Sequence, residues 1–480
     1  MAKFYVTTSI AYTNAVPHIG YAMELIQGDV LARYNRQQGN EVWYLTGTDE
    51  HGTKNKQAAE AAGKEPQAYV DEMSEHFKKL AVTLDVATDQ FIRTSDPNHK
   101  KACQALWKAC EKDIYKADYE GWYCVGCEQF YTEIELPDHI CPIHKKPLDK
   151  IKEQNYFFKL SAYTAQIKEL IQSDQLLIRP QTRKNEIMAL LERGLEDVSI
   201  SRDKKQLTWG VPVPGDEDQV MYVWFDALPN YITAVGYPDG SKFQKYWPAD
   251  LHIIGKDILR FHAALWPAML LSAGLSLPKS LYVHGFISSE GHKMSKSLGN
   301  VVAPGDVIDK YGVDALRYYL LREIPSDGDG DFSWARMESV YNADLANDLG
   351  NLVQRVQVMF TKYFDRVIGD LPPHSHDIRP YQEAMTALRF DKALAEVWLL
   401  IRGLNQFLEE EKPWELAKGD KDHLSEVLHH AVSDLVQIAT LLMPFMPKTA
   451  EKIAQTFSGG VARAEVGLLF PKHEAKTEAK

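Results

Sequence analysis

The sequence predicts an α/β protein: a parallel sheet that is split by an insertion and followed by an all-α helical bundle. Strand-like and helix-like segments alternate over residues 1–114 and again over 216–290, which favours parallel strands with helices on their faces. Residues 115–215 interrupt this alternation with cysteine, proline, aromatic and charged residues. From about 336 to 458 nearly every segment fits an amphipathic helix.

The first part of the sheet begins with a strand over residues 4–10. Apolar side chains at positions 19, 23, 26, 30 and 34 recur at helical spacing and predict a helix directly after it. A second strand over 41–46 ends at Gly-Thr-Asp-Glu-His-Gly (47–52), and a helical stretch covers about 54–84. In such sheets ligands bind at the carboxyl ends of the strands.

The second part of the sheet is expected from three short apolar segments, 220–224, 251–254 and 280–284, with a helix over about 260–271. We therefore divide the chain at the points where the pattern changes. The expected parts are the two halves of the α/β domain (1–114 and 216–290), the insertion (115–215), a linking subdomain with a basic loop (291–335), the helical domain (336–465) and a tail (466–480).

Composition narrows the class of protein. The 480 residues carry a net charge of −12, so a nucleic-acid partner requires a local basic face. No apolar run reaches the roughly 20 residues of a membrane helix, and the first residues do not resemble a signal peptide. We expect a cytoplasmic protein with no membrane partner and, because no further module follows the helical domain, a monomer.

Metal-ligating side chains form two short-spaced pairs, Cys124-x-x-Cys127 and Cys141-x-x-His144. Three thiolates and one imidazole on two knuckle turns complete a tetrahedral site, the usual coordination of structural zinc. Since four protein ligands leave no position for a water, the predicted Zn²⁺ stabilises the insertion and takes no part in chemistry. His139 is a competing ligand, but it lies outside the knuckle spacing.

A second metal candidate is an acidic stretch between 327 and 338, where oxygen-bearing residues stand in the register of a calcium loop. The position that requires glycine for the sharp turn is Phe332. We therefore interpret this stretch as a solvated acidic turn.

Two segments combine glycine with cationic side chains. His18 and Gly20 stand at the start of the first helix, where glycine lets an anion approach free backbone N–H groups. Lys293 and Lys296 lie in the loop Gly-His-Lys-Met-Ser-Lys-Ser-Leu-Gly-Asn (291–300), which could carry ammonium groups to a polyphosphate. Taken alone, each segment is equally compatible with an ordinary helix start or a solvated basic loop.

Taken together, Pro17-His-Ile-Gly-Tyr21 and Lys293-Met-Ser-Lys-Ser297 resemble the two nucleotide-binding signatures of class I aminoacyl-tRNA synthetases, whose catalytic domain is Rossmann-like. Tyr21 stands where that class often has histidine, so a role for it is in doubt, and Leu228 falls where some relatives have proline. Further segments resemble the methionyl-tRNA synthetases in particular: 10–20, 46–52, 121–124, 223–227, 254–257, 261–262 and 266–267.

The resemblance implies a site for each small substrate. The catalytic residues that act on the phosphates of ATP, with Mg²⁺, would be His18, Gly20, Lys293 and Lys296, while Gly255 and Asp257 would hold the adenosine. The methionine pocket would consist of Ile10, Asp49, Trp224, Ala227, Tyr231, His262 and Trp266. This composition suits an unbranched thioether, which calls for an apolar and aromatic pocket with one carboxylate for the ammonium. Without the resemblance, the tryptophans read as ordinary core.

In the helical half, Asn351 and Arg355 lie one turn apart on a predicted helix, and Trp414 begins another helix after Pro413. Single-stranded RNA is read by such amide, guanidinium and ring groups, although any helical bundle carries some of them by chance. The resemblance implies that these three residues recognise the CAU anticodon of tRNA(Met), and that the insertion holds a single zinc.

The implied reaction has two steps. The carboxylate of methionine attacks the α-phosphate of ATP to give methionyl-adenylate and pyrophosphate, and the terminal ribose of the tRNA then attacks the activated carbonyl. Because the substrate brings its own nucleophile, the protein contributes positioning and charge stabilisation. Two alternatives stay open: another class I synthetase or a small nucleotidylyltransferase, and a zinc-stabilised RNA-binding protein that has lost the reaction.

Overall fold

The computed structural model describes residues 2–131, 136, 138–142, 145–294, 299–374, 376–457, 462 and 467–473. The chain divides into two compact units, one of Met1–Pro17 and Asn35–His284 and the other of His18–Tyr34 and Gly285–Lys480. Most of the first helix therefore belongs to the second unit, although its sequence lies inside the first. Among the described helices, none combines the length and the apolar composition of a membrane-spanning segment.

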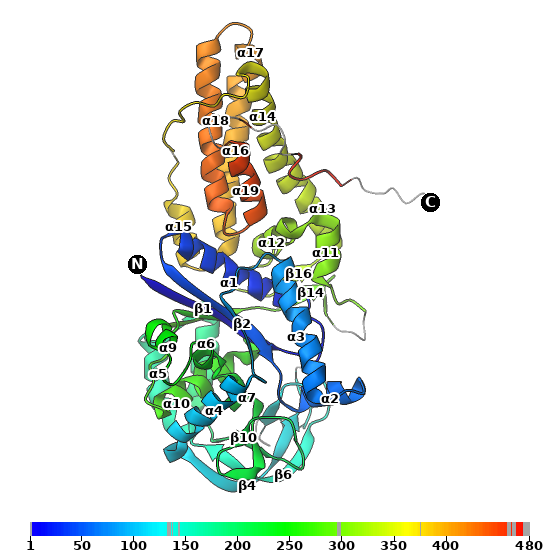
Figure 1. Ribbon diagram of the computed structural model, residues 1–480, viewed down its shortest axis with the longest axis vertical. Helices are drawn as coiled ribbons and strands as arrows, with labels where there is room; N and C mark the ends of the chain where they lie inside the picture. The colour runs from blue at the N-terminus through cyan, green and yellow to red at the C-terminus, as the bar shows by residue number, and fades with distance from the viewer. Residues whose placement is uncertain are drawn as a thin grey trace, which may run out of the picture. The chain divides into compact units, whose positions relative to one another are not determined.

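The first unit is built on a six-stranded parallel sheet in the order β3-β2-β1-β12-β13-β7. Its strands are β1 (Lys3–Tyr12), β2 (Glu41–Asp49), β3 (Gln90–Arg93), β7 (Leu177–Arg179), β12 (Leu251–Gly255) and β13 (Ser280–His284). The chain runs outward from β1 to β2 and β3 on one side and from β12 to β13 on the other, with the earlier strand β7 added at that edge. The switch point, where such sheets bind ligands, therefore lies between β1 and β12. The predicted parallel sheet is confirmed (Figure 1).

Short helices connect the strands of this unit. They are α2 (Thr53–Ala61), α3 (Pro66–Thr83), α4 (Pro97–Ala109), α5 (Thr164–Gln172), α6 (Gln181–Arg193), α7 (Val223–Ala227), α8 (Asn230–Thr233), α9 (Ser241–Tyr246) and α10 (Trp266–Ser272), with the single turns η1 (Glu111–Asp113), η2 (Leu160–Tyr163), η3 (Lys256–Ile258) and the π-helix η4 (Phe261–Leu265).

Two of the expected elements differ from the structure. The helical stretch over 54–84 is two helices, because Gly63 adopts a φ of +65° and Pro66 starts the second one. The expected strand over 220–224 was wrong in its second half, since the strand ends at Met221 and α7 begins at Val223. Trp224 therefore projects from a helix.

The expected insertion forms antiparallel sheets of its own and also contributes β7 to the edge of the main sheet, where β7 pairs with β13. A long ladder between β4 and β6 runs from Ile114 opposite Phe158 to Tyr123 opposite Asp149 and carries Cys124 at its far end. The strands are β4 (Ile114–Cys124), β5 (Gln129–Tyr131), β6 (Asp149–Phe158), β8 (Val198–Ser199), β9 (Ser201–Asp203), β10 (Pro212–Val213) and β11 (Asp216–Met221).

The second unit combines α1 (Ile19–Gln37), a small three-stranded sheet and a helical bundle. In the bundle, α14, α16 and α18 pack side by side (Figure 1). The further elements are β14 (Ile287–Ser289), β15 (His292–Lys293), β16 (Gly330–Phe332), α11 (Pro304–Tyr311), α12 (Val313–Arg322), α13 (Trp334–Val340), the π-helix η6 (Tyr341–Gly350), α14 (Asn351–Tyr363), α15 (Arg379–Thr386), α16 (Phe390–Glu411), α17 (Pro413–Leu416), α18 (Lys421–Leu442) and α19 (Pro447–Thr456).

The acidic stretch after residue 327 fastens the hairpin that leads to the basic loop. The Asp329 carboxylate accepts the N–H of Phe286 at 2.8 Å, and the Asp331 carboxylate accepts the N–H of Gly291 at 2.8 Å. Phe332 is fully buried and pairs in β16. These carboxylates already serve backbone N–H groups, in agreement with the rejection of a calcium loop.

A buried arginine ties α1 to the helical bundle. The Arg317 guanidinium on α12 donates to Asp29 of α1 at 2.7 Å, and both side chains are fully buried. The same guanidinium donates to the carbonyl oxygens of Phe445 at 2.7 Å and Pro444 at 2.9 Å, in the turn between α18 and α19. A buried charge is tolerated only when it is paired and hydrogen-bonded in this way.

Candidate functional site

The residues expected to bind the small substrates within the first unit lie at the carboxyl ends of neighbouring strands. Ile10 is near the end of β1, Asp49 ends β2, and Gly255 ends β12, with Asp257 in the turn that follows. The β1–β2 pairing sets Ile10 opposite Gly47 and Tyr12 opposite Asp49. The parallel sheet thus gathers positions that lie more than 240 residues apart in the chain.

Four of the predicted pocket residues form a cluster of buried rings. Trp224 lies with its ring centroid 6.2 Å from that of His262, and Tyr231 lies 5.7 Å from His262 and 6.1 Å from Trp266. Trp224 also stacks on Phe261, with centroids 4.0 Å apart and planes at 7°. Two further predicted residues belong to the same core: Ala227 is buried on the same short helix as Trp224, and Ile10 packs against the cluster.

Hydrogen bonds define the tautomer of His262. Its Nδ1 lies 3.0 Å from the carbonyl oxygen of Ile258, an acceptor, so Nδ1 carries the proton. Its Nε2 is then an acceptor and receives the hydroxyl of Tyr231 at 2.8 Å. Burial lowers the pKa of His262 to about 4. The pocket therefore contains a neutral imidazole and a fixed hydroxyl among apolar rings.

We expect His262 to stay neutral throughout the physiological range. Because its folded pKa of about 4 lies below the ordinary value, its contribution to stability is present above about pH 6.5 and is lost as the pH falls towards 4. NMR titration of labelled histidine, with His262→Gln to assign the signal, measures this midpoint. His423 is the matched control, because its hydrogen bond to Glu411 raises the pKa. A His262 midpoint near 6.5 would contradict the prediction that burial keeps this imidazole neutral.

Asp49 is a buried carboxylate without a cation. It is 2% exposed, and its Oδ1 has no hydrogen-bond partner among the described residues. Burial, followed by the nearby carboxylates of Asp226 and Glu128, raises the pKa of Asp49 well above its usual range. An uncompensated buried carboxylate is costly, so this position favours a cationic ligand that would restore the ionised form.

Other buried polar atoms beside Asp49 also have no hydrogen-bond partner among the described residues. They include the hydroxyl of Tyr12 and the indole N–H group of Trp224. The Tyr12 ring lies edge-on to Trp224, with centroids 6.4 Å apart, and Tyr12 pairs with Asp49 in the sheet. Buried polar groups are normally paired, so a group of orphans around one carboxylate marks a place for a ligand.

Glu128 connects the insertion to this pocket, and the sequence analysis did not assign it a role. Its carboxylate accepts the N–H of Lys54 at 2.7 Å, at the start of α2, and also the hydroxyl of Tyr123. Burial raises the pKa of Glu128 to about 7. A Cβ added at Gly52 would lie only 3.0 Å from the Glu128 carboxylate. Glu128 thereby fixes the turn that leads out of Asp49.

Three of the four predicted metal ligands lie together. The Sγ atoms of Cys124, Cys127 and Cys141 are all within 4.8 Å of one another, close enough to bind one metal ion. His139, the competing ligand, stacks on Trp122 with ring centroids 3.7 Å apart. His144, the fourth predicted ligand, lies outside the described residues.

In the second unit, Gly20 provides room for the ring of His18. The Nδ1 of His18 accepts the N–H of Gly20 at 3.0 Å and so caps the start of α1. A Cβ at position 20 would lie 2.9 Å from the ring. With Nδ1 as acceptor, the neutral ring carries its proton on Nε2, where it can donate to a phosphate oxygen.

The two nucleotide-binding signatures are neighbours within this unit. The N–H of Ile19, next to His18, donates to the carbonyl of Val302 at 3.2 Å, directly after the basic loop. Lys293 lies in β15 opposite Ser288, and Asn300 donates to the Lys293 carbonyl at 3.2 Å, which closes the base of the loop. Lys296 lies outside the described residues.

A similar arrangement holds at the end of β12. A Cβ on Gly255 would lie 2.8 Å from the Asp257 carboxylate, so glycine at this position leaves space for that side chain. Asp257 is exposed in the turn η3. Gly255, like Gly20, therefore stands close to a polar side chain, although the exposed Asp257 carboxylate is free to rotate away from an added Cβ.

The three residues expected to read RNA line one pocket of the bundle. Asn351, Arg355 and Trp414 surround a cavity of about 630 Å³ together with Gln354 and Asn405. The Arg355 guanidinium donates to the amide oxygen of Asn405 at 3.1 Å and to the carboxylate of Glu409. We refer to this cavity as the Trp414 pocket.

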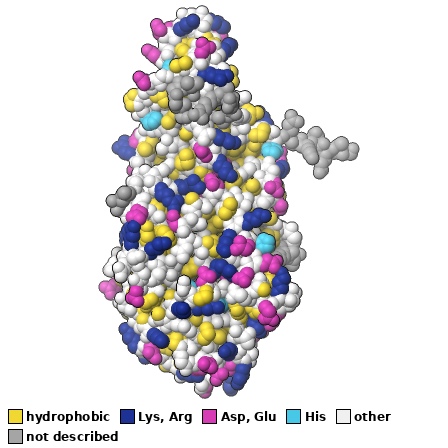
Figure 2. Space-filling model, in the orientation of Figure 1, with side chains coloured by type: hydrophobic (Ala, Val, Ile, Leu, Met, Phe, Trp, Pro, Cys, Tyr) yellow, Lys and Arg dark blue, Asp and Glu magenta, His cyan; other side chains and the backbone are white. Residues whose placement is uncertain are grey.

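Charge on the surface is mixed. On the face in Figure 2, Lys and Arg side chains are interspersed with Asp and Glu, in keeping with the net charge of −12.

Comparison with known proteins agrees with this geometry. A family model described as "tRNA synthetases class I (M)" matches residues 4–148 and 133–357, and one described as "Anticodon binding domain of methionyl tRNA ligase" matches 366–465. The first covers more than half of the chain. The chain is therefore a class I aminoacyl-tRNA synthetase.

Individual relatives narrow the class. The methionine–tRNA ligase of Caldanaerobacter subterraneus is 44% identical over 94% of this chain and 73% of its own, and that of Thermotoga maritima is 43% identical over 95% and 75%. The methionyl-tRNA synthetase of Mycobacterium tuberculosis in complex with methionyl-adenylate has a TM-score of 0.91 and 39% identity, covering 98% of this chain and 99% of that one. The chain belongs to the methionyl-tRNA synthetase family, as its signatures predicted.

Proposed function

We propose that the protein is a methionine–tRNA ligase that activates L-methionine with ATP and transfers it to tRNA(Met), selected by its CAU anticodon. The observation that carries this proposal is Asp49, a buried carboxylate with an unpartnered oxygen beside a cluster of aromatic rings. Such a site matches the ammonium and the apolar thioether of one amino acid.

In the first step, Asp49 holds the ammonium and thereby positions the carboxylate of methionine. The rings of Trp224 and Trp266 exclude water around the side chain, with Ile10 and Ala227 completing the apolar wall. The hydroxyl of Tyr231, fixed by His262, lies where it can reach the sulfur. Attack on the α-phosphate of ATP then needs only alignment and charge stabilisation.

The phosphates of ATP are the proposed ligands of His18, Gly20, Lys293 and Lys296. The positive end of the α1 dipole and the Nε2 proton of His18 suit an anion. Mg²⁺ enters with ATP and supplies neutralising charge to the phosphates. The adenosine is assigned to Gly255 and Asp257. In the second step the terminal ribose of the tRNA attacks the activated carbonyl and AMP leaves.

We assign the metal of the insertion as a single structural Zn²⁺. Three sulfur ligands within bonding range of one point favour zinc over a hard cation such as Mg²⁺. His144 is proposed as the fourth ligand from its spacing to Cys141 in the sequence. The domain boundaries stated from the sequence remain our proposal, as do a cytoplasmic location, which tRNA charging requires, and a monomeric state.

Lys296→Ala is expected to slow methionine-dependent ATP–pyrophosphate exchange about a hundredfold, because a cation that stabilises developing phosphate charge is lost. Binding of tRNA, measured by filter retention, should change little. Unchanged exchange would remove Lys296 from the active site. Wild-type protein that binds tRNA tightly but shows no exchange would instead support an RNA-binding protein without the reaction.

Trp414→Ala is expected to raise the KM for tRNA about tenfold or more, because a base loses its stacking surface. Exchange, which involves no tRNA, should stay as in the wild type. The measurement is steady-state aminoacylation beside exchange on the same preparation. A variant with impaired exchange and normal charging would show that the two activities are divided differently between the units.

A further inference from the structure

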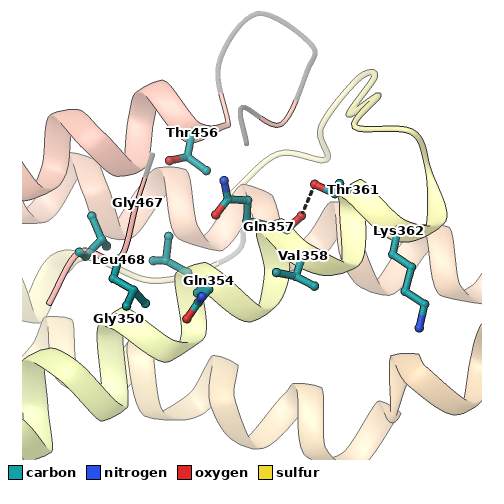
Figure 3. Close-up of a pocket in the computed structure, with 11 residues that line it drawn as sticks. Gly350, Gln354, Gln357, Val358, Thr361, Lys362, Thr456, Gly467 and Leu468 are labelled. Atoms are coloured by element: carbon teal, nitrogen blue, oxygen red, sulfur yellow. Dashed lines mark hydrogen bonds between the residues drawn. The ribbon is translucent and has the colours of Figure 1, made fainter. Parts of the chain in front are cut away.

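A second cavity lies beside the Trp414 pocket on the helical bundle. It has a volume of about 390 Å³ and is bounded by α14, by Thr456 at the end of α19 and by residues 467–469 (Figure 3). Gln354 and Val358 line both cavities, so the two hollows meet along one face of α14. We refer to the second one as the Gln357 cavity.

The Gln357 cavity combines polar edges with apolar walls. The side chains of Gln354 and Gln357 extend from α14 towards the space in front of residues 467 and 468 (Figure 3). Gln357 is 9% exposed and forms part of the wall, whereas Gln354 is exposed. The Gln354 carboxamide presents a donor and an acceptor side by side, the pattern that recognises the edge of a base. Val358 and Leu468 are 54% and 55% exposed and offer apolar surface to a ring.

Two further groups suit a nucleotide. The Thr361 hydroxyl donates to the Gln357 carbonyl at 3.0 Å, which leaves its oxygen as an acceptor. Lys362 is exposed at the rim, next along α14. An ammonium beside an amide-lined hollow is the arrangement that holds the phosphate of an unpaired nucleotide while its base enters the hollow.

The far wall of the cavity is anchored within the same unit. Phe470 is buried and lies edge-on to Tyr341, with centroids 5.8 Å apart. The Tyr341 hydroxyl donates to the carbonyl of Pro471 at 3.0 Å. These contacts hold residues 467–471 against η6, so the hollow exists before a ligand arrives.

We propose that the Gln357 cavity binds a nucleotide of the tRNA anticodon loop that adjoins the anticodon, so that the bundle reads more of the loop than three bases. The proposal rests on the proposed function, which places the anticodon in the Trp414 pocket. The occupant follows from the adjacency of the two hollows, which share Gln354 and Val358 as lining residues, because the nucleotide next to the anticodon is the part of the tRNA nearest to a base held in the Trp414 pocket.

Gly467→Phe tests the proposal by filling the cavity. A Cβ at Gly467 meets nothing within 4 Å, so the larger side chain can be accommodated without displacing the backbone. The KM for tRNA in aminoacylation is expected to rise about tenfold, because the nucleotide loses a few hydrogen bonds and contacts with the protein. Gln357→Leu, which removes the amide at similar size, should act in the same direction. Gly403→Phe on α16 is the matched control, since its Cβ also meets nothing within 4 Å and it lines neither cavity.

Two tRNA transcripts identify the nucleotide, each lacking the base on one side of the anticodon. With wild-type protein, one transcript should lose about tenfold in kcat/KM, and with Gly467→Phe the same transcript should lose less than about twofold, because the contact is already absent. Two results would overturn the proposal. In the first, the loss of kcat/KM from the missing base and the loss from Gly467→Phe multiply for both transcripts. In the second, Gly467→Phe charges tRNA like the wild type. If Trp414→Ala still raises the KM for tRNA in that case, only the assignment of the Gln357 cavity is wrong. If Trp414→Ala leaves the KM for tRNA unchanged, the proposed recognition of the anticodon is wrong as well.

Discussion

Replacing Asp49 with asparagine is expected to lower kcat/KM for methionine in ATP–pyrophosphate exchange about a thousandfold, because a buried ammonium would lose its charged partner. The substitution keeps the shape of the side chain, and Asp49 is 2% exposed, so water cannot replace the lost charge. The effect should appear mainly in methionine binding, since Asp49 is the only carboxylate proposed to touch the substrate.

Calorimetry gives an independent reading of the same contact. Burial raises the pKa of Asp49, and a bound ammonium would lower it, so a proton that Asp49 loses on binding should appear as a dependence of the measured heat on the ionisation enthalpy of the buffer. Asp49→Asn should abolish this dependence. Asp174→Asn is the control, since Asp174 is an exposed carboxylate of the same unit, paired with Lys184 at 2.6 Å. Near-normal methionine binding by Asp49→Asn would refute the assignment.

Removal of the metal is expected to reduce the rate of ATP–pyrophosphate exchange about a thousandfold, because the cysteine cluster then loses its fixed geometry. This loss of activity would come in addition to a loss of stability. Cys127 is directly followed by Glu128, whose carboxylate holds the N–H of Lys54 at the start of α2. A disordered knuckle releases that carboxylate and with it the turn beyond Asp49. A chelator such as phenanthroline, or Cys124→Ser, followed by metal analysis and exchange, measures the effect.

Two variants separate the metal from the carboxylate. Cys110→Ala removes a buried thiol outside the sulfur cluster and should keep both metal and activity. Glu128→Gln should keep the metal and lose exchange, because the charged acceptor of the α2 N–H is gone. Full exchange by metal-free protein would show that the insertion folds without its ion.

The part of the site that could be predicted from the sequence is the part that the parallel sheet imposes. Asp49, Ile10 and Gly255 follow strands with clear apolar patterns, and the carboxyl ends of parallel strands necessarily meet at one edge. The cysteine pairs carry their own spacing rule. The cysteine pairs were therefore found from their spacing, whereas Asp49, Ile10 and Gly255 were named from the family resemblance, and the strand pattern accounts only for their lying at one edge of the sheet.

Other features depend on packing between distant segments, which no local pattern encodes. Glu128 reads as a surface residue next to a metal ligand, and only the fold buries it against α2. Trp224 follows an apolar run typical of a strand, yet tertiary contacts such as its stack on Phe261 place it on a helix. The buried partner of Arg317 is Asp29, 288 residues away.

The ion pair between Arg317 and Asp29 limits where the polypeptide chain can be cut into separately expressed parts. A polypeptide that starts at residue 285 would lack α1 and with it Asp29, the buried carboxylate that the Arg317 guanidinium contacts at 2.7 Å. Truncation at that boundary should therefore yield insoluble material, and so should a permutation that removes the first forty residues from the bundle. Supplying α1 as a separate peptide should recover a folded bundle.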